Sequence, residues 1–372
     1  MNILIAPNSM KGSLNAVEFA DTVEKAFLNC SRKFKIRKVP VADGGDFTGE
    51  ILKRALNARD VQLQVKGPLG EKVNAVYAVS GKTAIIEMAG ASGIQLIKTE
   101  QLNPMNASTF GTGQLILDAV KKGCNNILLG IGGSATVDGG SGMTEALGFQ
   151  LLNKNDEKLS GNGRNLAFIK KIKTPDLNHD ITFKIISDVN NPLLGKNGAA
   201  KIFGPQKGAD DEMVNQLEKG LKDWADLLEK ESGKKLADHE GAGAAGGIAV
   251  PLMAFFNAEI VPGADFILSR LNFEEHLEWC DIVITGEGKI DGQTLNTKAP
   301  MAVARAARNR QKPVFAFGGT VYKEASEIFD GIFSILSEPV SLEKAMENSG
   351  ELLFDFSYQF ANMLYQLKLK HD

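Results

Sequence analysis

The chain has 372 residues, of which 43% are hydrophobic and 23% are charged, and its formal net charge is −3. This length is enough for two domains, and the composition is ordinary for a globular protein with a sizeable core. The slightly negative charge, without any basic tract, excludes the electrostatic pattern that is typical of nucleic-acid binding. No apolar run reaches the about 18 residues that cross a bilayer, so we expect no membrane partner.

The cysteines and the first residues indicate the compartment. Cys30, Cys124 and Cys280 are odd in number and far apart, which favours free thiols in a reducing cytoplasm. The opening stretch, MNILIAPNSMKGS, is a short apolar run that Pro7 interrupts, so it lacks the long apolar centre of a signal peptide. The four histidines show no metal-ligand spacing. We therefore expect a cytoplasmic protein without a zinc site.

The two ends of the chain share one alternation of buried strands and helices. Residues 2–7 and 34–40 are expected to be strands on either side of a helix at 15–28, where apolar residues recur at helical spacing. Six further elements are expected near the other end: strands at 281–291, 313–321 and 331–336, and helices at 299–310, 341–346 and 354–369. Five strands with intervening helices predict a parallel, flavodoxin-like sheet that is discontinuous in sequence.

The middle of the chain predicts a different, mixed α/β domain. Short strands joined by glycine turns between 61 and 90 indicate a β-meander. The following elements are expected to be a helix at 114–121, strands at 126–129 and 183–188, and an amphipathic helix at 213–230. We therefore predict a flavodoxin-like α/β domain formed by 1–54 and 276–372, an inserted mixed α/β domain at 55–275, and an active-site cleft between them.

Glycine-rich loops follow several of the predicted strands, and the longest is GIGGSATVDGGSGM at 130–143. Its first six residues satisfy the dinucleotide pattern G-x-G-x-x-G/A, but no helix starts at once and no acid stands where a ribose would need it. A second stretch, the GKT at 81–83, is not a P-loop because Val76 occupies the position of the first glycine. Six loops that combine glycine with acids or lysines instead predict a polar cleft suited to phosphoryl transfer, which depends on positioning and charge neutralisation.

Two residues are the candidates for catalysis. Asp188 follows the apolar strand TFKIIS, where a carboxylate can accept the proton of an attacking hydroxyl; the alternative is an aspartate that caps a turn before Asn and Pro. Lys11 lies in the first strand-to-helix loop, where its charge opposes the helix dipole and so calls for an anionic partner; the alternative is a solvated surface lysine. A phosphate or a carboxylate of the substrate would serve as that partner.

The chain resembles the type-1 glycerate kinase family in six stretches that span nearly its whole length. They are IAPNSMKGSL (5–14), VPVADGGDFT (39–48), GIGGSATVDGG (130–140), DVNNPLLGKNGAAKIFGPQKGA (188–209), GAGAAGGIA (241–249) and DIVITGEGKIDGQT (281–294). The resemblance implies a split two-domain fold and a kinase that transfers the γ-phosphoryl group of ATP to D-glycerate with Mg²⁺. It favours 2-phosphoglycerate over 3-phosphoglycerate as the product.

The resemblance also implies roles for particular residues. Asp188 and Lys11 are assigned to catalysis, and Asp138 and Asp291 to the metal, although acids in such loops can also cap turns. The positions assigned to substrate and nucleotide binding are Ser13, Asp43, Gly44, Gly45, Gly132, Gly133, Ser134, Asn190, Lys207, Gly286, Gly288 and Lys289.

The chain departs from the family pattern at several positions. Asn8 stands where an aspartate is usual, which removes a carboxylate from the mouth of the first strand. The other departures keep the loop lengths: Met10, Asp46-Phe47, Val137 and Thr297.

Two other functions fit the same sequence. One is an NAD-dependent hydroxy-acid dehydrogenase, and the other is a non-catalytic protein that binds a small anion. The kinase interpretation predicts ATP and D-glycerate as small-molecule partners, with neither nucleic acid nor membrane, and it is compatible with a homo-oligomer.

Overall fold

The computed structural model describes all residues except 43, 45–46, 177–179, 292–297 and 370–372, and its chain divides into two units. Unit 1 consists of Met1–Ile51 and Pro262–Asp372, and unit 2 is Leu52–Val261. Unit 1 is therefore discontinuous in sequence, as the pattern of strands and helices predicts.

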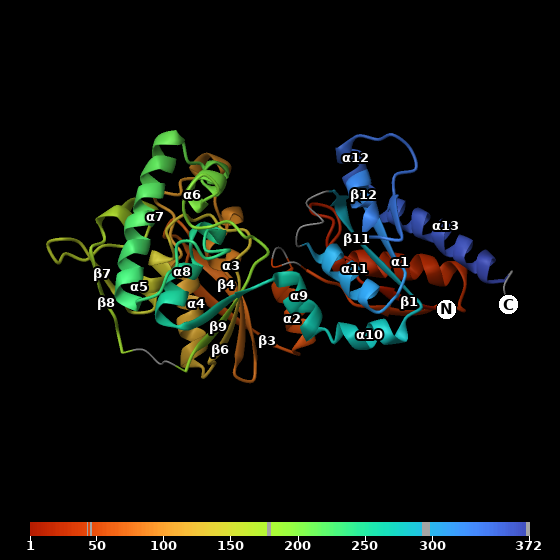
Figure 1. Ribbon diagram of the computed structural model, residues 1–372, viewed down its shortest axis with the longest axis horizontal. Helices are drawn as coiled ribbons and strands as arrows, with labels where there is room; N and C mark the ends of the chain where they lie inside the picture. The colour runs from red at the N-terminus through yellow and green to blue at the C-terminus, as the bar shows by residue number, and fades with distance from the viewer. Residues whose placement is uncertain (43, 45–46, 177–179, 292–297, 370–372) are drawn as a thin grey trace. The chain divides into compact units, whose positions relative to one another are not determined.

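Unit 1 is built on a five-stranded parallel sheet, coloured red at its first strands and blue at its last ones in Figure 1. Its strands are β1 (Asn2–Ile5), β2 (Lys35–Lys38), β11 (Ile282–Ile290), β12 (Val314–Val321) and β13 (Gly331–Ser334). Their order across the sheet is β13-β12-β11-β1-β2, and every neighbouring pair is parallel. This is the flavodoxin-like order, in which the direction of winding reverses beside the first strand. The predicted fold class is confirmed.

The alternation of side chains along β1 explains why helices cover both faces of this sheet. Ile3 and Ile5 pack in one apolar core with α1 (Ala16–Cys30) and α13 (Ser349–Leu369), which lie side by side in Figure 1. Leu4 and Ala6 belong to a second core on the opposite face. The helices of that core are α9 (Gly263–Arg270), α10 (Phe273–Trp279) and α11 (Ala299–Asn309). Successive residues of a strand point to opposite faces, so one short apolar run contributes to both cores.

Three further elements belong to the sequence range of unit 1 or to its border. They are α2 (Thr48–Ala55), which crosses from unit 1 into unit 2, the 3₁₀ turn η6 (Lys323–Glu327) and α12 (Leu342–Glu347).

Unit 2 contains a six-stranded mixed sheet in the order β10-β9-β6-β5-β4-β3. Its strands are β3 (Arg59–Lys66), β4 (Lys72–Ser80), β5 (Thr83–Glu87), β6 (Asn126–Gly130), β9 (Thr182–Ile186) and β10 (Asn257–Val261). The first three strands form the predicted antiparallel meander, and β5, β6, β9 and β10 are parallel. A separate hairpin pairs β7 (Gln150–Leu152) with β8 (Lys171–Lys173).

The helices of unit 2 share one core with its sheet. They are α3 (Ala89–Ser92), α4 (Phe110–Lys121), α5 (Ser141–Ala146), α6 (Ala199–Phe203), α7 (Asp211–Ser232) and α8 (Ala249–Phe255). Short 3₁₀ turns are η1 (Ile94–Leu96), η2 (Thr99–Gln101), η3 (Gly163–Phe168), η4 (Pro205–Lys207) and η5 (Ala244–Gly246). The long helix α7 places Trp224, which is fully buried, in this core. Among the described residues, no helix is long and apolar enough to cross a membrane.

The unit boundaries lie near the predicted limits at one crossing and away from them at the other. The first boundary falls after Ile51, against a prediction of residue 54. The second falls before Pro262 rather than at 276, because α9 and α10 pack on α11 and on the apolar core of unit 1. The predicted cleft between the domains stays a prediction.

Candidate functional site

The carboxyl ends of the parallel strands in unit 2 bring three sequence-distant segments to one edge of the sheet. Gly130 ends β6 beside Glu87 at the end of β5 and beside Ile186 at the end of β9. Loops that leave adjacent parallel strands at this edge form the usual ligand-binding side of an open α/β sheet. The glycine loop after β6 and the segment that begins with Ser187 and Asp188 therefore start next to each other.

The glycine loop after β6 is organised around the carboxylate of Asp138. One carboxylate oxygen accepts hydrogen bonds from the Thr109 N–H and hydroxyl, both at 2.8 Å, and from the Gly142 N–H at 3.2 Å. The other accepts from the Gly140 N–H at 3.1 Å. Thr109 directly precedes α4, and Gly140 directly precedes α5, so Asp138 satisfies N–H groups at the starts of two helices.

The surroundings of Asp138 give it a structural position. Its side chain is 0% exposed. Burial raises the pKa of this carboxyl above its usual value, and the hydrogen bonds from Thr109, Gly142 and Gly140 act against that rise. The predicted metal role finds no support in this geometry, because both oxygens face backbone and hydroxyl donors inside the unit. The sequence could not show this, since Thr109 lies 29 residues before Asp138.

Lys207, which lies 73 residues after Ser134 in the sequence, also contacts the glycine loop. It ends η4 and is 2% exposed. Its ammonium donates hydrogen bonds to the Ser134 hydroxyl at 2.6 Å and to the Thr136 carbonyl at 2.7 Å. Burial lowers the pKa of Lys207 to about 7, and the negative charge of Asp138 opposes this shift. Lys207 therefore points into the unit and contacts the loop, and its predicted contact with a substrate stays a prediction.

Close approach of backbones explains two glycines around this contact. A Cβ on Gly208 would lie 2.4 Å from the Leu102 carbonyl oxygen, and one on Gly246 would lie 2.2 Å from the Thr136 carbonyl oxygen. Both residues also have positive φ, at 91° and 73°. Glycine is needed at both positions because any side chain would push the adjoining segments apart.

The part of the glycine loop that can meet a ligand is its first turn. Gly132 is half-buried, Gly133 is exposed with a φ of 69°, and Ser134 is 7% exposed. The turn is anchored because the Ile94 N–H donates to the Gly133 carbonyl at 2.8 Å and the Ala135 N–H donates to the Ser92 carbonyl at 2.9 Å. These anchors fix the backbone without covering Gly133.

The segment after β9 places Asp188 beside this loop. Ser187 is buried, Asp188 and Val189 are half-buried, and Asn190 is exposed. The Ser187 hydroxyl accepts a hydrogen bond from the Val189 N–H at 3.2 Å, which tightens the turn. Asp188 therefore lies one short step beyond the strand end, as predicted, and Glu87 provides a second carboxylate at the same sheet edge that the sequence interpretation did not select.

Unit 1 has its own candidate site where the winding of its sheet reverses, at the carboxyl ends of β1 and β11. The Asn8 N–H donates to the Gly286 carbonyl at 2.8 Å, and the Asn8 side-chain oxygen accepts from the Ser9 N–H at 2.8 Å. A Cβ on Gly288 would lie 3.5 Å from the Met10 Cα. The loop after β1 and the end of β11 therefore run against each other.

Gly286 has a packing role that its predicted binding role did not include. A Cβ at this position would lie 2.2 Å from the Phe317 carbonyl oxygen and 2.6 Å from the Phe19 ring. Because both contacts are inside the unit, the absence of a side chain is explained by the core beneath the strand end.

Lys11 does not lie at the N-terminal end of a helix, so the prediction that it opposes a helix dipole is wrong. Helix α1 begins at Ala16, and the Asn15 side chain accepts hydrogen bonds from the N–H groups of Val17 and Glu18. The Glu18 carboxylate in turn accepts from the Asn15 N–H at 2.9 Å. This capping box satisfies the first turn with the chain's own groups, so the dipole calls for no external anion there. Lys11 is exposed, and Ser13 donates its hydroxyl to the Met10 carbonyl at 3.1 Å.

Charged residues occupy every second position at the end of β11 and directly after it, namely Glu287, Lys289 and Asp291. Glu287 is 5% exposed, and Lys298, directly before α11, places its ammonium 3.8 Å from the Glu287 carboxylate. Lys289 forms an ion pair with Asp291 at 2.8 Å. Glu287 is a buried carboxylate at the winding reversal that the sequence interpretation missed, because it selected Gly286, Gly288 and Lys289 in this stretch and passed over the acid between the two glycines.

Some predicted residues cannot be placed. Asp43 and Gly45 lie outside the described residues, and Gly44 between them has a φ of 88°. Within the described ranges, no group of three or more His, Cys, Asp or Glu side chains could hold a metal ion by itself.

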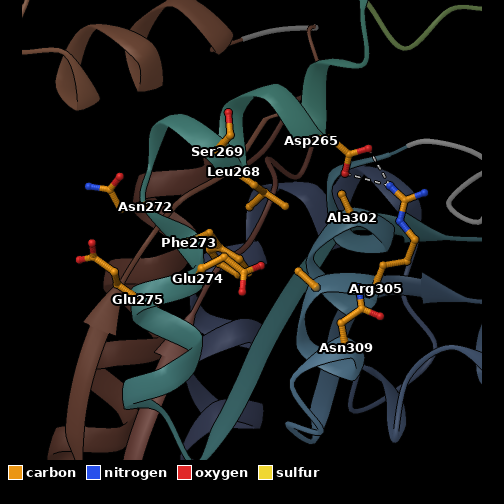
Figure 2. Close-up of a pocket in the computed structure, with 11 residues that line it drawn as sticks. Asp265, Leu268, Ser269, Asn272, Phe273, Glu274, Glu275, Ala302, Arg305 and Asn309 are labelled. Atoms are coloured by element: carbon orange, nitrogen blue, oxygen red, sulfur yellow. Dashed lines mark hydrogen bonds and ion pairs between the residues drawn. The ribbon is translucent and has the colours of Figure 1, made fainter.

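A hollow of 560 Å³ in unit 1 lies elsewhere, between α9, α10 and α11. Figure 2 shows Asp265 pointing towards Arg305, with which it forms hydrogen bonds of 2.9 and 3.0 Å. Its lining on α11 runs from Ala302 to Asn309, away from the N-terminal end of that helix, which follows the sheet's carboxyl edge. No predicted site residue lines it.

Comparison with known proteins gives one consistent result. A model of the glycerate kinase family matches residues 3–365. A glycerate 2-kinase of Escherichia coli K12 is 42% identical over 358 residues, which are 94% of each chain. A glycerate kinase of Bacillus subtilis 168 is 40% identical over 362 residues, which are 95% of each chain. The crystal structure of a protein assigned as glycerate kinase 2 from Salmonella typhimurium LT2 superposes with a TM-score of 0.87 at 38% identity, over 99% of each chain.

Proposed function

We propose that this chain, which belongs to the glycerate kinase family, transfers the γ-phosphoryl group of ATP to a hydroxyl of D-glycerate. The observation that carries the proposal is the family match over residues 3–365, which includes both units. The E. coli relative is named a glycerate 2-kinase, so we infer 2-phosphoglycerate as the favoured product.

Asp188 is the proposed general base of this reaction. Phosphoryl transfer needs a group that orients the attacking hydroxyl and accepts its proton. The half-buried carboxylate of Asp188 stands at the carboxyl edge of a parallel sheet, beside the exposed turn at Gly133. We infer that the N–H groups of Gly132 and Gly133 and the Ser134 hydroxyl bind an anionic group of a substrate at this edge.

The strand ends of unit 1 supply the second proposed set of groups. Lys11 and Lys289 are exposed cations near the winding reversal, where they can neutralise phosphate or carboxylate charge. In unit 1, Ser13 follows β1, Gly44 follows β2 and Gly288 lies in β11. In unit 2, Asn190 follows β9. Michaelis constants measured separately for ATP and for D-glycerate distinguish which set binds ATP.

The residues present fit Mg²⁺ that arrives with the nucleotide rather than a metal held by protein alone. Mg²⁺ is commonly bound by one or two carboxylates together with substrate phosphates. Asp291, whose side chain is 13% exposed and which directly follows β11, is the carboxylate that we propose to hold it. When bound, the ion would neutralise charge on the phosphate oxygens.

The two alternative functions are less well supported. The dinucleotide fingerprint requires a helix directly after its glycines, whereas α5 begins only at Ser141, after Asp138 has tied the loop to α4. The binding-protein alternative predicts no turnover.

The three cysteines are free thiols, which agrees with the reducing cytoplasm that we propose as the compartment.

Formation of ADP tests the proposal. Purified protein is incubated with ATP, Mg²⁺ and D-glycerate, and ADP release is followed by a coupled assay. We expect release that depends on D-glycerate. A rate no higher than that of the glycerate-free control would contradict a kinase, and reduction of NAD by glycerate would favour the dehydrogenase.

A further inference from the structure

Lys207 and Ser134 form a buried contact between segments that are 73 residues apart. A buried ammonium is costly unless oxygen atoms surround it, and Lys207 has the Ser134 hydroxyl and the Thr136 carbonyl at 2.6 and 2.7 Å. The contact joins η4 to the loop after β6. It therefore acts directly on the turn that carries Gly132 and Gly133.

The chemistry of an ammonium fixes the direction of this hydrogen bond. Below pH 7, where Lys207 keeps its proton, its ammonium has three N–H donors and no acceptor, so the Ser134 oxygen must accept. A serine hydroxyl has one O–H and two lone pairs. With a lone pair engaged by Lys207, the O–H of Ser134 points away from the ammonium. Ser134 retains 7% exposure beside the exposed Gly133, so its O–H can serve as a donor at the sheet edge.

We propose that Lys207 is a positioning residue that acts through Ser134, keeping the Ser134 O–H available as a donor to an anionic oxygen of a substrate. The inference rests on the proposed kinase function, and it changes the role of Lys207 from direct binding to support of the loop. The anionic oxygen belongs to a nucleotide phosphate or to the carboxylate of the hydroxy acid. Both present the same acceptor chemistry, and separate Michaelis constants distinguish them.

The experiment compares wild type with Lys207→Met, Ser134→Ala and the double variant. For each protein, kcat and KM are measured below pH 7, where Lys207 is charged, with ATP varied and then with D-glycerate varied. A hydrogen bond to a charged group corresponds to roughly 10- to 100-fold in affinity. We expect each single variant to raise KM by roughly that factor for one substrate, the same substrate in both, and the double variant to be no worse than Lys207→Met by more than about 3-fold.

Matched measurements separate this effect from general damage. Lys201→Met alters an exposed lysine in the neighbouring helix α6 and is expected to leave both Michaelis constants unchanged. If Lys207→Met does not fold, Ser134→Ala and Ser134→Thr replace it. Threonine keeps the hydroxyl and should retain most of the affinity that alanine loses, whereas equal values for the two would overturn the proposal.

The outcomes also distinguish this inference from the proposed function. A wild-type protein without glycerate-dependent ADP release would defeat the kinase proposal itself. With an active wild type, unchanged Michaelis constants in both single variants would overturn the role of Lys207. Effects that multiply in the double variant would do the same, because they would show two independent contributions.

Discussion

Asp138 accepts two hydrogen bonds from Thr109, one from its backbone N–H and one from its hydroxyl, each 2.8 Å long. The Thr109 hydroxyl oxygen in turn accepts from the Met143 N–H at 2.9 Å. Two residues from different segments thus connect the start of α4 to the start of α5. Gly139 and Gly140, which lie between Asp138 and the start of α5, have positive φ values of 58° and 71°. The connection through Asp138 therefore holds the glycine loop in a conformation that favours glycine.

Replacing the carboxylate of Asp138 is expected to destabilise the fold. In Asp138→Asn an NH₂ group would face N–H donors, so at least one charge-assisted hydrogen bond is lost and a donor is left without an acceptor. We expect the free energy of unfolding to fall by about 2–4 kcal/mol, measured by urea denaturation. Asp226→Asn removes an exposed ion pair with Lys222 and should cost less than about 1 kcal/mol.

A variant Asp138→Asn that is as stable as the wild type would support the predicted role of Asp138 as a metal ligand. If Asp138 binds Mg²⁺ with the nucleotide, Asp138→Asn would keep the unfolding midpoint of the wild type and would instead raise the Mg²⁺ concentration needed for half-maximal rate.

The stability of the protein should depend on pH through Lys207. The pKa of Lys207 is lowered to about 7 in the folded chain, from the usual lysine value of 10.5. Between these values the unfolded chain holds a proton that the folded chain lacks, so stability rises with pH. Relative to Lys207→Met, the wild type should gain up to about 1.4 kcal/mol per pH unit above pH 7. Urea unfolding at pH 7, 8 and 9 measures this, and a difference that stays constant would show that the ammonium keeps its proton.

The carboxylate of Glu287 is expected to matter for turnover more than for stability. Glu287→Gln keeps the size of the side chain but removes a negative charge at the winding reversal of unit 1. We expect kcat/KM to fall by about 100-fold, since preorganised charges in such sites have effects of that order. Thermal unfolding should change little. Glu324→Gln, an exposed change in η6, is the control, and an unaltered kcat/KM in Glu287→Gln would remove this residue from the site.

Asp188 should be needed for chemistry and not for folding. Asp188→Asn keeps the shape of the side chain and removes its ability to accept a proton, so kcat is expected to fall by about 10²–10⁴-fold. The exposed Asp176→Asn before β9 serves as the matched control. A kcat within a few-fold of wild type would show that another group, with Glu87 as the nearest candidate along the sheet edge, accepts the proton.

The sequence was sufficient for the architecture because each strand carries a local signal. The apolar run at 2–5 and its counterparts after residue 281 predicted a parallel flavodoxin-like sheet split between the two ends of the chain, and the observed order of strands confirms it. The boundary before Pro262 was less accessible, since α9 and α10 are short and their attachment to unit 1 depends on packing against α11.

From the sequence, site residues could be predicted only where they follow a predicted strand. Asp188 and Ser134 were predicted because they follow apolar strands, which is a local pattern, and their roles stay predictions. The buried positions of Asp138 and Lys207 depend on partners 29 and 73 residues away, so no local pattern could reveal them. Asn15 and Glu18 have the spacing of a capping box, which is a local signal that places the N-cap of α1 at Asn15, four residues beyond Lys11.

The most direct test of phosphoryl transfer follows the phosphorus atom itself. Purified protein, ATP, Mg²⁺ and D-glycerate are observed by ³¹P NMR until the γ-phosphate signal of ATP decreases. The account predicts that this phosphorus appears as a phosphate monoester of glycerate, coupled to the proton on carbon 2. A γ-phosphate that is recovered as inorganic phosphate, or that persists unchanged while glycerate is bound, would contradict it.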